Sequence, residues 1–198
     1  MTNAWDRLPP QPSPLPPGTP PPAAPAEAVT RVLKRTRQTR DFLPAPVPED
    51  VLADILDVAR WTGSAGNRQP WTFVVITDAD TRRRLAEAAP YTGHIGVAPV
   101  VVAIALEQRS PDVDGYEEGR LTERMQVAAT AHGLASGLAR LRDEAQLVAK
   151  ELLGTPDGVV VRSMVSLGYP TEAARAPKSA PGTARKPLAD VVRRERFG

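Results

Sequence analysis

The chain has 198 residues, of which 41% are hydrophobic and 24% charged, so it is long enough for one domain with its own core. A formal net charge of +2 argues against a dedicated nucleic-acid-binding protein, and the absence of cysteine excludes disulfides, iron–sulfur clusters and thiol nucleophiles. With two histidines and no metal-ligand motif, we expect no metal site. No apolar run approaches the roughly 20 residues of a membrane helix, and no signal peptide is recognisable, so we expect a cytoplasmic protein.

The N-terminal segment is rich in proline, with ten of the 22 prolines before residue 26. Proline fixes φ and lacks a backbone donor, so neither a helix nor a sheet suits this segment. We therefore predict that residues 1–26 form a disordered or polyproline-II tail and that residues 27–198 form one domain. A solvated leader is favoured over a ligand for signalling modules.

Helices and strands alternate irregularly along the rest of the chain. Apolar spacing, acidic first turns and the terminal Gly154 predict helices at 26–40, 48–62, 78–89, 116–138 and 143–154. Apolar runs rich in β-branched residues predict strands at 71–77, 98–107 and 158–170. Because no regular βαβ repeat is present, we predict an α+β fold.

A basic stretch spans residues 31–40, which carry five cations and no acid. Like charges this close repel one another unless an anion offsets them. Arg37 and Arg40 are three residues apart, which would make them neighbours on a helix face, and guanidinium groups suit phosphate oxygens. A solvated helix face is the alternative interpretation.

A polar loop lies within WTGSAGNRQPWTFVVI, residues 61–76, directly before a predicted strand. Gly63 and Gly66 allow the backbone to approach a flat ligand closely. Asn67 carries one acceptor and two donors, which match the edge of a heterocycle such as a flavin pyrimidine. An ordinary helix-to-strand loop in which Asn67 caps a turn is the alternative.

Both stretches, in this order, resemble motifs of the FMN-dependent nitroreductase family. The family motif Arg-Ser-x-Arg-x-Phe is matched by RQTRDF at 37–42, with Gln38 in place of Ser. The motif Ala-Pro-Ser-x-x-Asn-x-Gln-Pro-Trp is matched by TGSAGNRQPW at 62–71, with Gly63 in place of Pro, which predicts a looser loop. Residues 116–138 resemble the family's central helix and its Gly-Leu-Gly-like end, and RKPLADVV resembles its C-terminal phosphate-side element.

The resemblance implies a mixed or antiparallel sheet flanked by helices, with a site for FMN. The implied cofactor-binding residues are Arg37, Gln38, Arg40, Ser64, Asn67, Gly137, Leu138 and Arg185. Arg37, Gln38 and Arg40 would hold the phosphate and ribityl chain, and Arg185 would return to the phosphate. Ser64 and Asn67 would contact the ring or ribityl chain, and the backbone at Gly137 and Leu138 would lie near flavin N5. Arg40 is the candidate for stabilising the reduced flavin. No other catalytic side chain is expected, because the flavin performs the chemistry.

The resemblance also implies an activity. NAD(P)H would give a hydride to flavin N5 and leave, and a nitroaromatic, quinone or similar small acceptor would then take the electrons in a ping-pong reaction. Family members are homodimers that bind FMN across the subunit interface, so a homodimer is expected here.

Other interpretations stay open from the sequence. One is a non-catalytic flavin-binding or storage protein of the same fold, and another is a specialised member that fragments flavin, dehalogenates aromatics or dehydrogenates peptide heterocycles. A nucleic-acid-binding module using residues 31–40 is disfavoured by the near-neutral remainder and the 5% aromatic content. His94 is interpreted as an ordinary loop residue rather than a proton donor or substrate contact.

Overall fold

A computed structural model describes residues 26–177, 179–180 and 182–197 of the chain. The elements in chain order are α1 (Ala26–Arg35), α2 (Glu49–Arg60), η2 (Ala65–Asn67), β1 (Trp71–Ile76), α3 (Ala79–Glu87), α4 (Gly93–Val97), β2 (Val100–Glu107), α5 (Pro111–Ala131), β3 (Ala135–Arg140), α6 (Glu144–Leu153), β4 (Val159–Gly168), α7 (Glu172–Arg175) and α8 (Leu188–Val191). The predicted α+β class is confirmed. The predicted tail lies outside the described residues except for Ala26, so its boundary stays a prediction.

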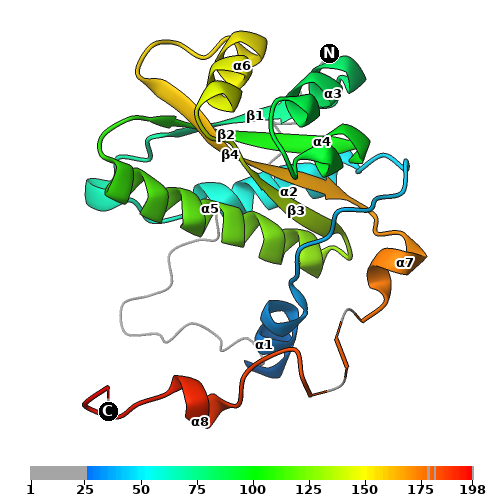
Figure 1. Ribbon diagram of the computed structural model, residues 1–198, viewed down its shortest axis with the longest axis vertical. Helices are drawn as coiled ribbons and strands as arrows, with labels where there is room; N and C mark the ends of the chain where they lie inside the picture. The colour runs from blue at the N-terminus through cyan, green and yellow to red at the C-terminus, as the bar shows by residue number, and fades with distance from the viewer. Residues whose placement is uncertain (1–25, 178, 181, 198) are drawn as a thin grey trace, which may run out of the picture.

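The four strands form one antiparallel sheet in the order β1-β2-β4-β3. Figure 1 shows α2 and α5 on one face of the sheet, and α3, α4 and α6 on the other. Alternate residues of the central strand β2 enter two separate cores: Val100, Val102, Ile104 and Leu106 face α2 and α5, whereas Val101, Ala103 and Ala105 face the other layer. The apolar run at 98–107 has no polar alternation because both faces of this strand are covered.

The predicted helix at 116–138 is wrong at its C-terminal end. Helix α5 ends at Ala131, because Gly133 has a φ of +74° and Leu134 N–H donates to the carbonyl of Ala129 at 2.9 Å. The following residues, Ala135–Arg140, form β3, which pairs with β4. This segment, ASGLAR, has no β-branched residue, so its strand conformation depends on its partner rather than on local propensity.

The predicted helix at 26–40 is also too long, because α1 ends at Arg35. Beyond it the chain is extended: Gln38 forms a parallel bridge with Ser136, and Thr39 N–H donates to the Ser136 carbonyl at 2.8 Å. Pairing with the sheet therefore overrides helical propensity. Arg37 and Arg40 consequently do not share a helix face.

Three carboxylates of α5 are buried: Asp114, Glu117 and Glu118. A bulge in β4 provides them with a cation, because Ile104 is opposite Ser163 and Ala105 is opposite Val161, which leaves Arg162 as the additional residue. The guanidinium of Arg162 lies 3.2 Å from the Asp114 carboxylate and 3.8 Å from that of Glu118. Arg109 forms an ion pair with Glu117. Opposite charges thus attach α5 to the sheet.

None of the helices within the described ranges combines the length and apolar character needed to cross a bilayer.

Replacing Arg162 with Met should lower the free energy of unfolding by about 3–5 kcal/mol, because Asp114 and Glu118 would lose a buried counter-charge. The matched control is Arg60→Met, which removes a partly exposed ion pair with Asp57 and should cost at most about 1 kcal/mol. Urea unfolding followed by circular dichroism measures both. Equal losses in the two variants would contradict a structural role for the buried network.

Candidate functional site

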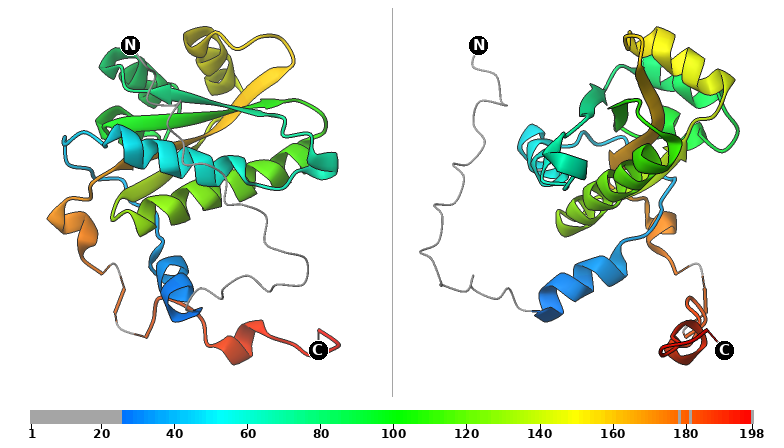
Figure 2. Two further views of the ribbon diagram at one scale, coloured as in Figure 1. Left: turned by 180° about the vertical axis from the view of Figure 1, so that it is seen from behind. Right: turned by 90° about the vertical axis from the view of Figure 1, so that its left-hand side faces the viewer.

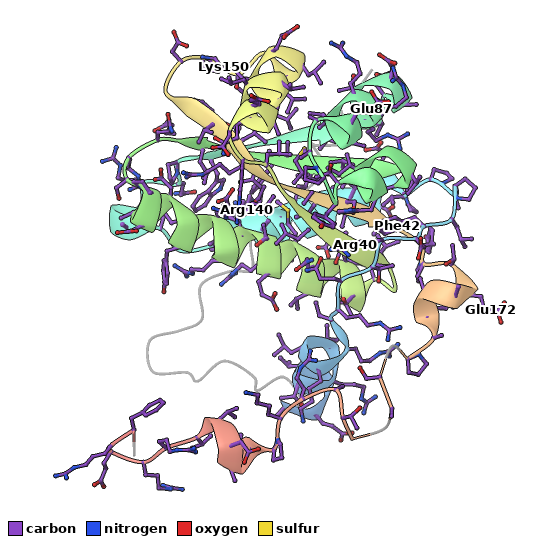
Figure 3. All side chains as sticks on the ribbon, viewed as in Figure 1. Arg40, Phe42, Glu87, Arg140, Lys150 and Glu172 are labelled. Carbon is purple, nitrogen blue, oxygen red and sulfur yellow. The ribbon has the colours of Figure 1, made fainter. Side chains whose placement is uncertain are left out.

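The extended segment that follows α1 lies along the outer edge of β3. Besides the backbone bond from Thr39, the side-chain Oε1 of Gln38 accepts from Leu138 N–H at 2.6 Å. Further on, Phe42 forms an antiparallel bridge with Pro170, next to the end of β4. In Figure 3 Arg40 and Phe42 lie near one another where this segment crosses the end of the sheet. The structure therefore brings the first motif together with the predicted residues Gly137 and Leu138.

Gly137 lies at the closest approach of three elements. A Cβ atom at this position would lie 2.4 Å from the Thr39 carbonyl oxygen, 2.8 Å from His94 Cδ2 and 2.8 Å from Ser166 Oγ. The Ser166 hydroxyl also donates to the Gly137 carbonyl at 3.1 Å. A side chain would push the segment away from β3, so glycine is required by packing and not by helix termination.

His94 is buried in the short helix α4, so its interpretation as an ordinary loop residue is wrong. Neither imidazole nitrogen has a hydrogen-bond partner among the described residues. Burial, and secondly the positive charge of Arg40, lower the pKa of His94 below its usual 6.5, so the ring is neutral at pH 7. A neutral imidazole thus lies beside Gly137 and within electrostatic range of Arg40.

Arg37 and Arg40 have different surroundings. Arg37 Nη2 donates to the carbonyls of Ala174 and Arg175, at 3.2 and 2.7 Å, which are among the unpaired carbonyls at the end of α7. Arg40 is exposed and makes no side-chain hydrogen bond within the described part of the chain. Residues three apart on an extended segment point to opposite sides, which explains the separation. Both guanidinium groups retain donors for an anion.

The loop of the second motif is held by its own hydrogen bonds. Ser64 Oγ accepts from Gln69 N–H at 2.8 Å, and the Ser64 carbonyl accepts from Asn67 N–H at 2.9 Å. Gln69 Nε2 lies 3.2 Å from Asn67 Oδ1. Gly66, Asn67 and Gln69 all have positive φ, at 62°, 54° and 49°. The loop therefore has a defined and unusual backbone conformation rather than that of a simple capped turn.

A pocket of about 500 Å³ lies between this loop and the first half of α5. The residues that line it are Ser64, Ala65, Asp112, Val113, Tyr116, Glu117 and Arg120. Those on α5 were not predicted as site residues. Asp112 and Val113 precede the predicted helix, because α5 begins at Pro111 and not at Tyr116, and the others were interpreted as ordinary helix positions. The contact between Arg120 and the loop at Gly63 becomes visible only in the three-dimensional structure.

The two groups of predicted site residues lie at opposite parts of α5. The loop is bonded to Arg120, whereas the segment after α1 reaches α5 at Thr130, whose hydroxyl is 3.2 Å from that of Thr36. Ten residues of helix correspond to about 15 Å along its axis. Arg185 joins neither group, because it lies in the C-terminal segment that extends away from the sheet in both views of Figure 2. One copy of the chain does not gather all predicted residues.

Comparisons with known proteins identify sequence relatives of this chain. The sequence model of the Nitroreductase family matches residues 33–90, which contain both motifs. A Thermus thermophilus protein named NADH dehydrogenase is 32% identical over 181 residues, covering 74% of this chain and 88% of the relative. An Archaeoglobus fulgidus protein, whose name joins NADH dehydrogenase and NAD(P)H nitroreductase, is 28% identical over 152 residues, covering 74% of this chain and 87% of the relative.

Solved structures show the same fold. An FMN-dependent nitroreductase from Clostridium difficile R20291 superposes with a TM-score of 0.75 at 22% identity, covering 84% of this chain and 98% of the other. A Desulfovibrio desulfuricans protein solved in complex with FMN superposes with a TM-score of 0.68 at 23% identity, covering 86% of this chain and 98% of the other.

The neutral state of His94 predicts a pH dependence of stability. Since its pKa is lowered on folding, the unfolded chain takes up a proton below about pH 6.5 that the folded chain does not. The free energy of unfolding, relative to that of His94→Phe, should therefore fall between about pH 7 and pH 5, by up to about 1.4 kcal/mol per pH unit. Denaturant titrations over this range measure the difference.

Arg40→Gln should reduce this pH dependence without abolishing it, because burial is the larger cause of the shift. Parallel pH curves for wild type and His94→Phe would contradict the assignment of a neutral buried imidazole.

Proposed function

The chain belongs to the nitroreductase family, and from this premise we propose that it is an FMN-dependent oxidoreductase. It takes electrons from NAD(P)H and reduces small acceptors such as nitroaromatics or quinones. The observation that carries the proposal is the pairing of Gln38 with β3, which sets the segment carrying the exposed Arg37 and Arg40 against the backbone of Ser136 and Leu138. The relatives named NADH dehydrogenase and NAD(P)H nitroreductase support the choice of electron donor.

The residues on this edge fit FMN chemically. A phosphate dianion requires cationic donors, and the segment at 37–40 supplies two exposed guanidinium groups, those of Arg37 and Arg40. Arg37 and Gln38 would bind the phosphate side, whereas Arg40 would bring positive charge to the region where negative charge develops on reduction. Ser64 and Asn67, on the preformed loop, would contact the ring or ribityl chain. When bound, FMN supplies a ring that accepts an electron pair and passes it on.

We propose that NAD(P)H and the acceptor use the same face of the bound flavin in turn. NAD(P)H binds, is oxidised and leaves before the acceptor binds, which is a ping-pong scheme. The chain's own contribution is to bind and orient the reactants and to keep His94 uncharged beside Arg40, so that no second positive charge repels the guanidinium.

A homodimer accounts for the separation of the two motifs. The loop and the Arg37–Arg40 segment meet α5 about 15 Å apart along the helix, and Arg185 joins neither group, so a second copy would supply contacts that one chain does not gather. A two-fold axis that sets two α5 helices antiparallel would place the loop of one copy near the segment of the other. The C-terminal segment with Arg185 extends outward, where a second copy would lie (Figure 1).

Adding NADH or NADPH anaerobically to the FMN-loaded protein should bleach the flavin absorbance, and nitroaromatics or quinones should restore it. Stopped-flow spectroscopy measures both half-reactions, and parallel double-reciprocal plots would support the ping-pong order. Retention of FMN without bleaching by either nucleotide would instead identify a flavin-binding or storage protein.

Arg37→Ala should weaken FMN binding by roughly tenfold or more, because a charge-assisted phosphate contact is lost. Arg35→Ala is the matched control, since it removes the same charge from the exposed end of α1. Fluorescence titration of apoprotein with FMN measures both dissociation constants. Equal affinities for the two variants would count against a phosphate role for Arg37.

A further inference from the structure

Two residues of α5 are bonded to peptide groups on either side of Ser64. Arg120 Nη1 donates to the Gly63 carbonyl at 2.7 Å, and Glu117 Oε1 accepts from Ala65 N–H at 3.1 Å. Because the two side chains are three residues apart on a helix, they lie on one face. We refer to this pair as the Glu117–Arg120 clamp.

The clamp residues are themselves fixed. Glu117 is 2% exposed and forms an ion pair with Arg109, which attaches it to the end of β2. The guanidinium carbon of Arg120 lies 5.7 Å from the centroid of the Tyr116 ring, within cation–π range. Both side chains therefore reach the loop from ordered positions.

Gly63 makes room for the guanidinium. A Cβ atom at residue 63 would lie 3.1 Å from Arg120 Nη2, tighter than ordinary van der Waals contact. Gly63 is also the position at which the sequence departs from the family motif, and the departure suggested a looser loop. In the structure, Arg120 fills the space and bonds to the same residue, so the departure is compensated.

The loop requires such external support. Asn67 and Gln69 occupy the left-handed region, which is unfavourable for residues other than glycine, and such conformations persist only where the surroundings impose them. The bonds between Ser64, Asn67 and Gln69 shape the loop internally but do not attach it to the domain. The clamp provides that attachment at the residue whose hydroxyl closes the loop.

We propose that Glu117 and Arg120 are positioning residues that hold loop 63–69 in the conformation in which Ser64 and Asn67 meet the cofactor. This inference rests on the proposed function for its cofactor, but the clamp itself acts on the empty protein. Its consequence is that FMN meets a loop already in place, so binding does not have to order it. Glu117 and Arg120 need not touch FMN to affect its affinity.

The test uses Arg120→Ala, Gly63→Ala and the double variant, with Arg84→Ala as the control at an exposed position of α3, on the other side of the sheet. Hydrogen exchange by mass spectrometry on apoprotein, over peptides covering residues 61–70, reports the loop without cofactor. Arg120→Ala should speed exchange there by about tenfold and weaken FMN binding by roughly three- to tenfold, with little change in the thermal midpoint. Arg84→Ala should change none of these.

Gly63→Ala gives an independent arm, because its methyl group would crowd the guanidinium and shift it by a few tenths of an ångström. Alone it should weaken FMN binding, but in the Arg120→Ala background it should add little, since the group that it displaces is already absent. Arg120→Lys should restore part of the protection, because it retains a donor but not the planar group that stacks on Tyr116.

The proposed clamp would be contradicted if Arg120→Ala showed the same hydrogen exchange and FMN affinity as the wild type. Additive effects in the double variant would contradict it as well. A wild-type protein that binds no FMN would overturn the proposed function instead. In that case the apoprotein exchange data would still decide whether the clamp holds the loop.

Discussion

The attachment of α5 to the sheet sets the position of every part of the candidate site. Its apolar residues, including Leu121 and Met125, pack in the core that also contains Val102 and Ile104 of β2. Its buried carboxylates are matched by cations from the sheet side, with Arg162 delivered by a bulge in β4. Removing charge from water is costly unless it is paired, so this arrangement tolerates little displacement of the helix. Loop 63–69 contacts α5 at Arg120, and the segment after α1 contacts it at Thr130. A fixed position of α5 therefore fixes the distance between these two parts of the candidate site.

The second constraint is the edge of β3. The segment after α1 pairs with this edge only because Gly137 has no side chain, and the same glycine lies against His94. Backbone pairing and close packing therefore place Gln38 and Arg40 on a rigid sheet rather than on a mobile loop. Sites built on regular elements keep their geometry better than sites built on loops. The one loop that the proposed site does use is bonded to α5 at two peptide groups.

Family membership and geometry answer different questions about this protein. The Thermus thermophilus relative, at 32% identity, establishes the family, and the structural neighbours establish the fold. The separation of the two motifs along α5 concerns assembly: on the proposed function, a second copy would contribute to the cofactor site. Substitutions at the interface and in the motifs would then affect the same property, the retention of FMN.

Much of the fold could be predicted from the sequence because its causes are local. Apolar periodicity and terminal residues located α2, α3 and α6, and Gly154 ends α6 in the left-handed conformation as expected. Continuous apolar runs located β1, β2 and β4. The central strands β2 and β4 are buried along most of their length, whereas β1, at the edge of the sheet, is only partly buried. The two motifs were also local patterns, and they indicated the family before any geometry was known.

The tertiary structure alone decided where α1 ends, that residues 135–140 form a strand, that His94 is buried and that Arg120 bonds to Gly63. Each depends on groups far apart in sequence, such as Thr39 with Ser136, or Arg162 with Asp114. Helical propensity in residues 26–40 loses to a backbone hydrogen bond across about a hundred positions, which no local pattern contains. Sequence by itself therefore determined the elements with local causes and the chemistry of the motifs, whereas long-range pairing and packing determined where that chemistry lies.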